Sequence, residues 1–422
     1  MMLFGWPLSC SAAEPALNLR QLIEAAKHNN KDVQVARYAV DVGRGRLVQA
    51  GLLPNPRLDL SARSDFLFGN EGEYGRSATI SQQFPIAGRI LREKDVARVD
   101  VALAQAEVDE AEWRLAGNVA SAVYQILLID RQVQSRDVLI AIEGKLAKAT
   151  RDRFKAAEVS ELDVNTVQLD LQRLAQEQVL LQSQRESQMV ALNTLLGRPA
   201  DAVVSIGEPL PETDEIPSLA QLQSQALMSR PDFRAALLGA DRALSETALA
   251  KAQRWEDWSA GLVFEQDKLF INGGPPQRSS RAIGLTLTIP LPLLNKNQGS
   301  IAAAQASNEQ AAARIDALRL SIAGEVAGAH AETIKLQQLL TQFHQTLLAL
   351  SARNVALAQK GYGQGLVSVV EVVQAQRQQA DLNASYLNTL DQFLQALARL
   401  RNADGYYIAG VDSTSASTTK DH

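Results

Sequence analysis

The stretch GLTLTIPLPLLNKNQGSI, residues 284–301, contains two different patterns joined end to end. Apolar side chains alternate with glycine, threonine and proline in its first half: Leu285, Leu287, Ile289 and Leu291. This period of two is typical of a strand with one apolar face. After Pro292 the alternation stops, and a run rich in alanine and glutamine continues without proline. The stretch therefore predicts a junction between a strand and a long helix.

The chain of 422 residues contains the same layout twice. Residues 17–41 match 217–241, and residues 153–168 match 361–376. Such self-similarity indicates a structural repeat. We predict repeats at 17–197 and 217–405, joined by a linker at 198–216 that is rich in proline and acidic residues.

Each predicted repeat begins with short helices and continues with two alternating strands. The strands are expected at about 56–66, 76–86, 258–267 and 282–291. Each has about ten residues, which is enough for a tilted strand to cross a bilayer. A strand on a soluble sheet has the same alternation, so the pattern of a single strand leaves both interpretations open. The prolines expected at the strand–helix junctions are Pro54, Pro56, Pro85, Pro290 and Pro292.

Long helical regions follow the strands, at about 90–197 and 297–405. Both have to turn back once, and the expected turning points are 154–163 and 360–368. Alanine, glutamine and serine at many core positions favour thin, closely packed helix pairs of the coiled-coil kind.

The two ends of the chain have different signals. Residues 1–13 are interpreted as the remnant of a secretory signal with a cleavage site near Ala13, and lipidation of Cys10 or a cytosolic N-terminus are the alternatives. Residues 406–422 are expected to form a flexible tail. The sequence has no run of 18 apolar residues, so a membrane segment would have to consist of strands.

Four strands cannot close a membrane barrel, because the smallest such barrels have about eight strands. Open strand edges in a bilayer leave backbone groups unpaired. Three chains would supply about twelve strands, so we predict a homotrimer whose barrel continues into a tube of long helices. The fold class is mainly α with a membrane β-barrel, four strands per chain and a coiled-coil periplasmic tunnel.

Residues 17–405 resemble the TolC-type outer-membrane factors of Gram-negative efflux and secretion systems. The resemblance rests on the duplicated layout, the L-x2-L-x3-A start of each repeat, GLLPNP at 51–56 and the hairpin turns. SQQFPIAGRI (81–90) and TIPLPLLNKNQGSI (288–301) resemble the cobalt–zinc–cadmium branch, which is called CzcC-like.

The resemblance implies a passive duct in the outer membrane that extends into the periplasm. Expected partners are two further copies of the chain, outer-membrane lipid, a periplasmic adaptor (membrane fusion) protein and an inner-membrane RND pump. Neither a catalytic residue nor a cofactor is expected. Export of drugs or of polypeptides (type I secretion) is an alternative function, and a soluble periplasmic coiled-coil scaffold is another.

The resemblance also implies functional residues at the hairpin turns. The expected periplasmic aperture residues are Glu371, Gln374, Val367 and Asp163. An acidic ring would favour cations, but both acids would equally suit the first turn of a helix. The residues expected at the tips, where an adaptor would dock, are Phe154, Ser160, Gly361, Tyr362, Gly363, Gly365 and Ser368. The three glycines are expected to make the second turn.

Composition argues against two classes of function. The net charge of −5 gives no basic surface for nucleic acid. One cysteine and four scattered histidines argue against a dedicated metal site. His330 and His344 would lie about 21 Å apart on one helix, too far to share an ion.

Overall fold

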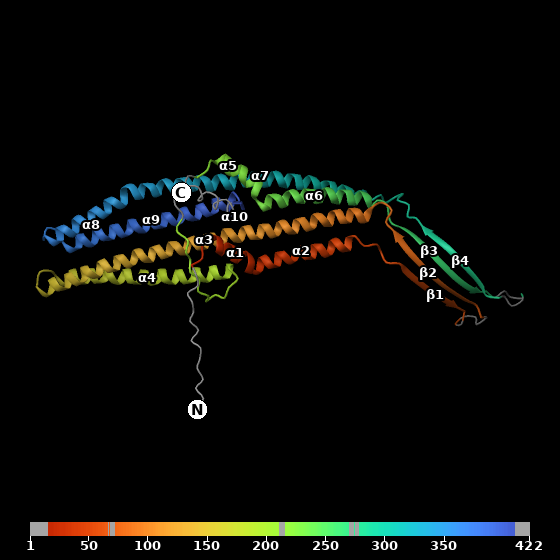
Figure 1. Ribbon diagram of the computed structural model, residues 1–422, viewed down its shortest axis with the longest axis horizontal. Coiled ribbons are helices and arrows are strands. Elements are labelled where there is room, and N and C mark those ends of the chain that lie inside the picture. Colours follow the sequence, from red (N-terminus) through yellow and green to blue (C-terminus); the bar gives the residue numbers. More distant parts are fainter. Residues whose placement is uncertain are drawn as a thin grey trace, which may run out of the picture. The chain divides into compact units, whose positions relative to one another are not determined.

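A computed structural model describes residues 16–65, 67, 72–210, 216–269, 274 and 278–409. The predicted signal segment with Cys10, part of the linker and the chain beyond Ala409 lie outside these residues. In chain order the elements are α1 (Leu19–Asn29), α2 (Lys31–Ala50), β1 (Arg57–Ser64), β2 (Tyr74–Phe84), α3 (Arg89–Lys155), α4 (Glu161–Leu195), α5 (Leu219–Ser229), α6 (Pro231–Ala252), β3 (Trp258–Lys268), β4 (Ser280–Thr288), α7 (Gln298–Gln342), the π-helix η1 (Phe343–Leu347), α8 (Leu348–Gly363), α9 (Val369–Ala403) and α10 (Tyr406–Ala409) (Figure 1).

The chain divides into two compact units. Of the described residues, the helical unit contains 16–35, 108–210, 216–231 and 319–409. The sheet unit contains residues 36–107 and 232–318. Within the described residues, none of the helices combines the length and apolar character that crossing a membrane requires.

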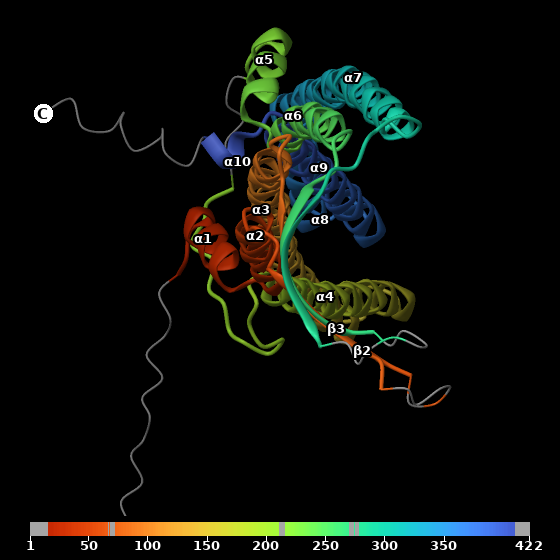
Figure 2. The same ribbon diagram turned by 90° about the vertical axis from the view of Figure 1, so that its right-hand side faces the viewer.

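The sheet has the order β1-β2-β3-β4, and every neighbouring pair is antiparallel. The strand register lines up residues in rows across the sheet, which curves along its length (Figure 2). Two apolar rows lie on one side of it, Leu58–Ile80–Leu262–Leu285 and Leu60–Ala78–Phe264–Ile283. We call this side the apolar face.

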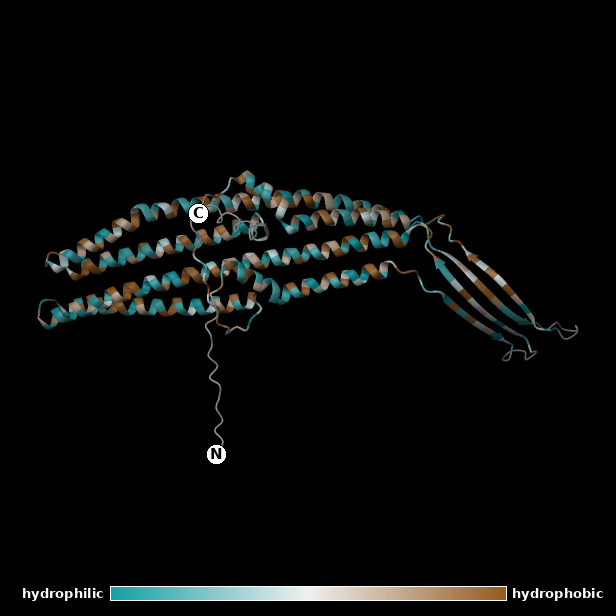
Figure 3. Cartoon of the chain, in the orientation of Figure 1, coloured by the Kyte–Doolittle hydropathy of each residue, from teal (hydrophilic) through white to brown (hydrophobic). Residues whose placement is uncertain are grey.

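The opposite side carries rows such as Ser61–Ser77–Glu265–Ala282, and we call it the polar face. Figure 3 shows the resulting alternation of hydrophobic and hydrophilic residues along the strands. The strands β1 and β4 form the two edges, and every residue in them is exposed. A single chain therefore has an exposed apolar face and two strand edges.

The strand bounds differ from the sequence prediction by at most three residues, and the start of β3 coincides with it. The largest difference is in β4, which was predicted at 282–291 but spans Ser280–Thr288. Pro290 has no N–H to donate to a neighbouring strand, so pairing ends just before it. Ile289 and Leu291 continue the apolar alternation outside the sheet, and both are exposed.

The junction prolines lie between the helices and strands. Pro54 and Pro56 lie between α2 and β1, Pro85 follows β2, and Pro290 and Pro292 lie between β4 and α7.

Two side chains fix the segments next to these prolines. Arg89, the first residue of α3, donates from Nη2 to Asp257 Oδ2 (2.6 Å) and from Nε to Asp257 Oδ1 (3.2 Å). This two-point pair holds the start of α3 against the start of β3. Asn297, with φ +57°, donates from Nδ2 to the Ala250 carbonyl (2.8 Å) just before α7 begins.

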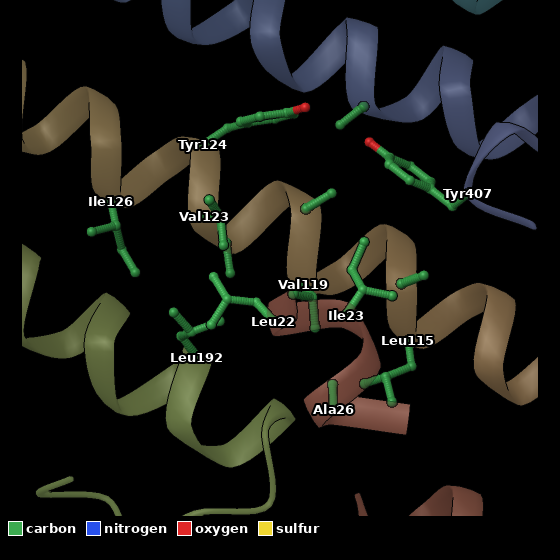
Figure 4. Close-up of a cluster of buried hydrophobic side chains, with 14 of the residues drawn as sticks. Leu22, Ile23, Ala26, Leu115, Val119, Val123, Tyr124, Ile126, Leu192 and Tyr407 are labelled. Atoms are coloured by element: carbon green, nitrogen blue, oxygen red, sulfur yellow. The ribbon is translucent and has the colours of Figure 1, made fainter. Parts of the chain in front are cut away.

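The core of the helical unit forms where α1 packs against α3 and α4 (Figure 4). Leu22, Ile23 and Ala26 of α1 are almost completely buried. They meet the α3 side chains Val119, Val123 and Ile126, whose spacing of four and three residues places them on one helix face. Leu192 of α4 closes this cluster.

The predicted tail at 406–422 is wrong in its first residues. Tyr406–Ala409 form α10, and Tyr407 is only 2% exposed within the core. An aromatic side chain buries a large apolar area, and this burial fixes the short helix.

Glycines end the last long helix of each repeat. Gly197 (φ +66°) lies against the carbonyl of Asn29, at the end of α1. Gly405 (φ +78°) lies against Ser229, at the end of α5. The two repeats therefore place a left-handed glycine in the same position, against the end of their first helix.

The helical region between β4 and the second turn contains a π-helix, which the sequence did not predict. It spans Phe343–Leu347, between α7 and α8. Phe343 is buried, and its ring contacts the ring of Tyr386 edge-on at 6.2 Å between centroids. A π-turn accommodates one extra residue without ending the helix.

Candidate functional site at the two hairpin tips

Two helical hairpins end in turns with the same backbone hydrogen bonds. The first hairpin is α3 and α4, with its turn at 156–160, and the second is α8 and α9, with its turn at 364–368. In the first turn, Ala157 N–H donates to the Phe154 carbonyl and Glu158 N–H to the Arg153 carbonyl, both at 2.9 Å. The second turn repeats this pattern, from Gly365 to Tyr362 (3.1 Å) and from Leu366 to Gly361 (2.9 Å). Both are Schellman-type helix ends.

Each turn needs one residue in the left-handed region. That residue is Ala157 (φ +59°) in the first turn and Gly365 (φ +72°) in the second. The prediction that all three glycines make the second turn is therefore wrong for Gly361 and Gly363, which lie in α8. A Cβ on Gly361 would lie 2.5 Å from Cγ2 of Val367, so this glycine makes room for the valine, whereas Gly363 has open space around it.

In both hairpins the second helix begins with a capping box. The Ser160 hydroxyl accepts from Asp163 N–H (3.3 Å), and Asp163 Oδ2 accepts from Ser160 N–H (3.0 Å). Ser368 and Glu371 are related in the same way, at 3.3 Å and 2.8 Å. The two acids predicted at the aperture thus stabilise the starts of α4 and α9.

The remaining residues predicted at the aperture and tips lie around these turns. Gln374 is exposed on α9, one turn after Glu371, and Val367 is half-buried against Gly361. Phe154 is exposed. Tyr362 lies under the guanidinium of Arg153, whose carbon is 4.6 Å from the ring centroid. This cation–π contact joins the first hairpin to the second at their tips.

Farther from the turns, a small apolar cluster continues the contact between the hairpins. It consists of Val167 from α4 and Val369 and Val373 from α9, with Leu146 and Ala147 of α3 packed against it. The three valines are nearly completely buried. The cation–π pair and this cluster hold the two tips together.

Next to the valines lie buried charged groups that the sequence analysis missed. Asp170 of α4 is 3% exposed and accepts from Nε and Nη2 of Arg377 on α9, both at 2.8 Å. Glu143 of α3 is also 3% exposed. In the sequence both acids resemble the many solvated charges of a long polar helix, so no local signal distinguishes them.

A comparison with known families identifies the chain. The sequence profile of the family described as outer membrane efflux protein matches residues 22–198 and 222–406. The chain belongs to this family. The profile matches once in each half, so this outer membrane efflux protein carries the family pattern twice.

Two curated relatives of this outer membrane efflux protein have informative names. The cobalt-zinc-cadmium resistance protein CzcC of Cupriavidus metallidurans is 26% identical over 405 residues, which are 91% of this chain and 89% of the relative. The pyoverdine export outer membrane protein OpmQ of Pseudomonas putida is 23% identical over 269 residues, 60% of this chain and 57% of the relative.

Solved structures confirm the fold class. A membrane protein from Pseudomonas aeruginosa superposes with a TM-score of 0.75 at 20% identity, covering 92% of both chains. CusC gives 0.75 at 18% identity, also covering 92% of both chains. VceC of Vibrio cholerae gives 0.72 at 20% identity, covering 92% of this chain and 96% of VceC.

This outer membrane efflux protein therefore has the fold of a trimeric outer-membrane channel. Three chains share a twelve-stranded membrane barrel, with four strands from each, and their long helices form the coiled-coil tunnel in the periplasm. The protein is an efflux channel of the outer membrane, and the soluble-scaffold interpretation is set aside.

The three histidines among the described residues lie on different helices. His330 lies within 3.1 Å of the Pro217 carbonyl through Nε2, His28 and His344 are on other helices, and His422 lies outside the described residues. The described part of the efflux protein contains no group of three or more His, Cys, Asp or Glu side chains that could hold a metal ion.

Proposed function

We propose that this outer membrane efflux protein is the passive exit duct of a tripartite system that exports heavy-metal cations of the cobalt, zinc and cadmium type. A periplasmic adaptor would dock at the hairpin tips, and an inner-membrane RND pump would supply the energy. The observation that carries the proposal is the similarity to CzcC over nine-tenths of both chains. A duct requires no metal site of its own, since the ion only has to pass through it.

Export of a small organic molecule is the second candidate. The similarity to a pyoverdine exporter favours it, although that match covers a smaller share of both proteins. Pyoverdine export is the function that this relative's name gives. Tolerance measurements separate the two candidates.

Deletion of the chromosomal gene is expected to lower the minimal inhibitory concentration of zinc, cobalt or cadmium several-fold and to leave tolerance to a panel of dyes unchanged. The pump cannot clear ions from the cell if their exit is missing. A plasmid copy of the intact gene should restore metal tolerance. Unchanged metal tolerance together with lost dye tolerance would show an exporter of organic molecules.

We further propose that Glu371, together with Asp163 at the equivalent position of the other turn, provides the negative charge of the periplasmic aperture, which Gln374 and Val367 border. Glu371 is exposed, and both of its capping bonds use Oε2. The carboxylate can therefore cap α9 and still present its charge. Three copies in the trimer would form a ring that favours cations.

Replacing Glu371 with glutamine separates these two roles, because glutamine also serves as the third helical residue of a capping box. We expect Glu371→Gln to lower the ratio of cation to anion permeability of the trimer in planar bilayers and to leave its thermal stability unchanged. Ser368→Ala is the matched control, since it weakens the cap and keeps the charge. Altered permeability in Ser368→Ala but not in Glu371→Gln would contradict the proposal.

A further inference from the structure

Four polar side chains lie between the two hairpins, next to the valine cluster, and all but the arginine are buried. They are Glu143 of α3, Asp170 of α4, and Gln376 and Arg377 of α9, and we call them the inter-hairpin cluster. They line a cavity of about 30 Å³. The four residues of the cluster come from three helices of two hairpins, so any change of charge in the cluster acts on the contact between the hairpins.

Asp170 forms an ion pair within the cluster, whereas Glu143 forms none among the described residues. Oδ1 of Asp170 receives both bonds from Arg377, and Nε of Arg173 is 3.5 Å from the same oxygen. Oε2 of Glu143 and Oε1 of Gln376 are buried and have no hydrogen-bond partner among the described residues. A buried carboxylate without a partner is unfavourable, whereas its protonated form is a donor that suits an amide oxygen.

We propose that Glu143 is a proton-binding site that controls the contact between the two hairpins. With the carboxyl protonated, α3 and α4 stay packed against α9. With the carboxylate ionised, the cluster holds an unpaired buried charge, and the hairpins separate to let water reach it. Opening of the efflux duct at its tips would then respond to pH. This role goes beyond the proposed export of metal cations and does not depend on which molecule is exported.

The electrostatic surroundings of Glu143 place its titration in a physiological pH range. The pKa of the Glu143 carboxyl is raised from 4.5 to about 7: burial is the main cause, the negative charge of Asp170 contributes in the same direction, and Arg377 opposes both. The other charged side chain at the cavity is Arg173 of α4. From α8 the cavity is lined by Val355 and Gln359, neither of which titrates.

The sign of the effect follows from these pKa values. In separated hairpins the carboxyl would lose its proton near pH 4.5, whereas in packed hairpins it keeps the proton up to about pH 7. The packed form therefore binds more protons between these values, and its stability falls as pH rises through them. The equilibrium constant for packing should fall by up to about tenfold per pH unit in this window and stay constant above it.

Hydrogen exchange of the full-length trimer in detergent tests the proposal. Protection of amides in 139–150 and 370–380, corrected for intrinsic exchange rates, is expected to fall by at least about tenfold between pH 5 and pH 7.5. Glu143→Gln, which cannot ionise, should keep high protection at both pH values. Glu186→Gln, which removes an exposed carboxyl of α4, should behave as the wild type. The same pH dependence in Glu143→Gln would overturn the proposal.

A second measurement needs no variant. Labelling with ¹³C-glutamate shifts the infrared band of Glu143 away from the bands of Asp391 and Asp404, whose pKa values burial also raises. The shifted band of a protonated carboxyl should be present in the labelled wild-type trimer at pH 5 and should disappear with a midpoint between pH 5 and pH 7. If Glu143→Gln fails to assemble, this titration decides the question, because the absence of such a band would overturn the proposal.

Discussion

Gly197→Ala is expected to lower the free energy of unfolding by about 3 kcal/mol. A non-glycine residue in the left-handed region costs about 1–2 kcal/mol, and φ at Gly197 is +66°. The new Cβ would also lie 2.5 Å from the carbonyl oxygen of Asn29 and 2.8 Å from its carbon. These are backbone atoms at the end of α1, which cannot move without disturbing the core, and overpacking costs about 1–3 kcal/mol. Thermal unfolding of the trimer in detergent, followed by circular dichroism, measures the loss.

Two other glycines separate the contributions at Gly197. Gly88 has φ +69° with open space around it, so Gly88→Ala should cost only the conformational part, about 1 kcal/mol. Gly405→Ala should lower the free energy of unfolding by an amount between those of Gly88→Ala and Gly197→Ala. Its new Cβ would meet the side chain of Ser229, whose hydroxyl lies 2.8 Å from the Asp404 carbonyl and would lose that bond on rotating away. Equal losses at Gly88 and Gly197 would show that the contact with Asn29 is unimportant.

Leu285→Arg is expected to abolish assembly of the trimer in the outer membrane. Leu285 lies in the middle of β4, on the apolar face, and is 88% exposed in the single chain. An arginine facing lipid near the bilayer centre costs about 2–4 kcal/mol, and the trimer would carry three of them. Membrane fractionation with heat-modifiable gel mobility should show no inserted trimer.

Gly284→Arg provides the matched control, because it introduces the same side chain one residue earlier. Successive residues of a strand point to opposite sides, so this arginine would lie on the polar face, and Gly284 has open space around it. The variant should assemble normally. If both variants assembled equally well, the apolar face would not contact lipid.

The sequence predicted the features that depend on a regular period. Alternation along Leu58 and Leu60, or Leu285 and Leu287, assigns each residue to a face without knowledge of its neighbours. The turn bonds at 153–158 and 361–366 repeat because the two halves repeat. Strand ends were less accurate, since the apolar alternation continues past the point at which Pro290 stops the pairing.

The burial of Glu143 and Asp170 could not be predicted in this way. An acidic residue on a helix rich in alanine and glutamine is interpreted as solvated, unless it is known which helix packs against the face that carries it. Residues of α8 and α9, from the other hairpin, surround these two carboxyls, and α9 follows Asp170 by about two hundred residues. Tyr407 was missed for a similar reason, because its place in the core depends on α1 and α3.

The exposed edges β1 and β4 have a genetic consequence. A chain whose edge is damaged still has its other edge, and so it can enter a trimer with two intact copies and leave their barrel open. When damaged and intact alleles are expressed equally and mix at random, only about one trimer in eight is built entirely from intact chains. Alleles that disrupt an edge strand should therefore be dominant over the wild type, whereas alleles that prevent the chain from folding should be recessive.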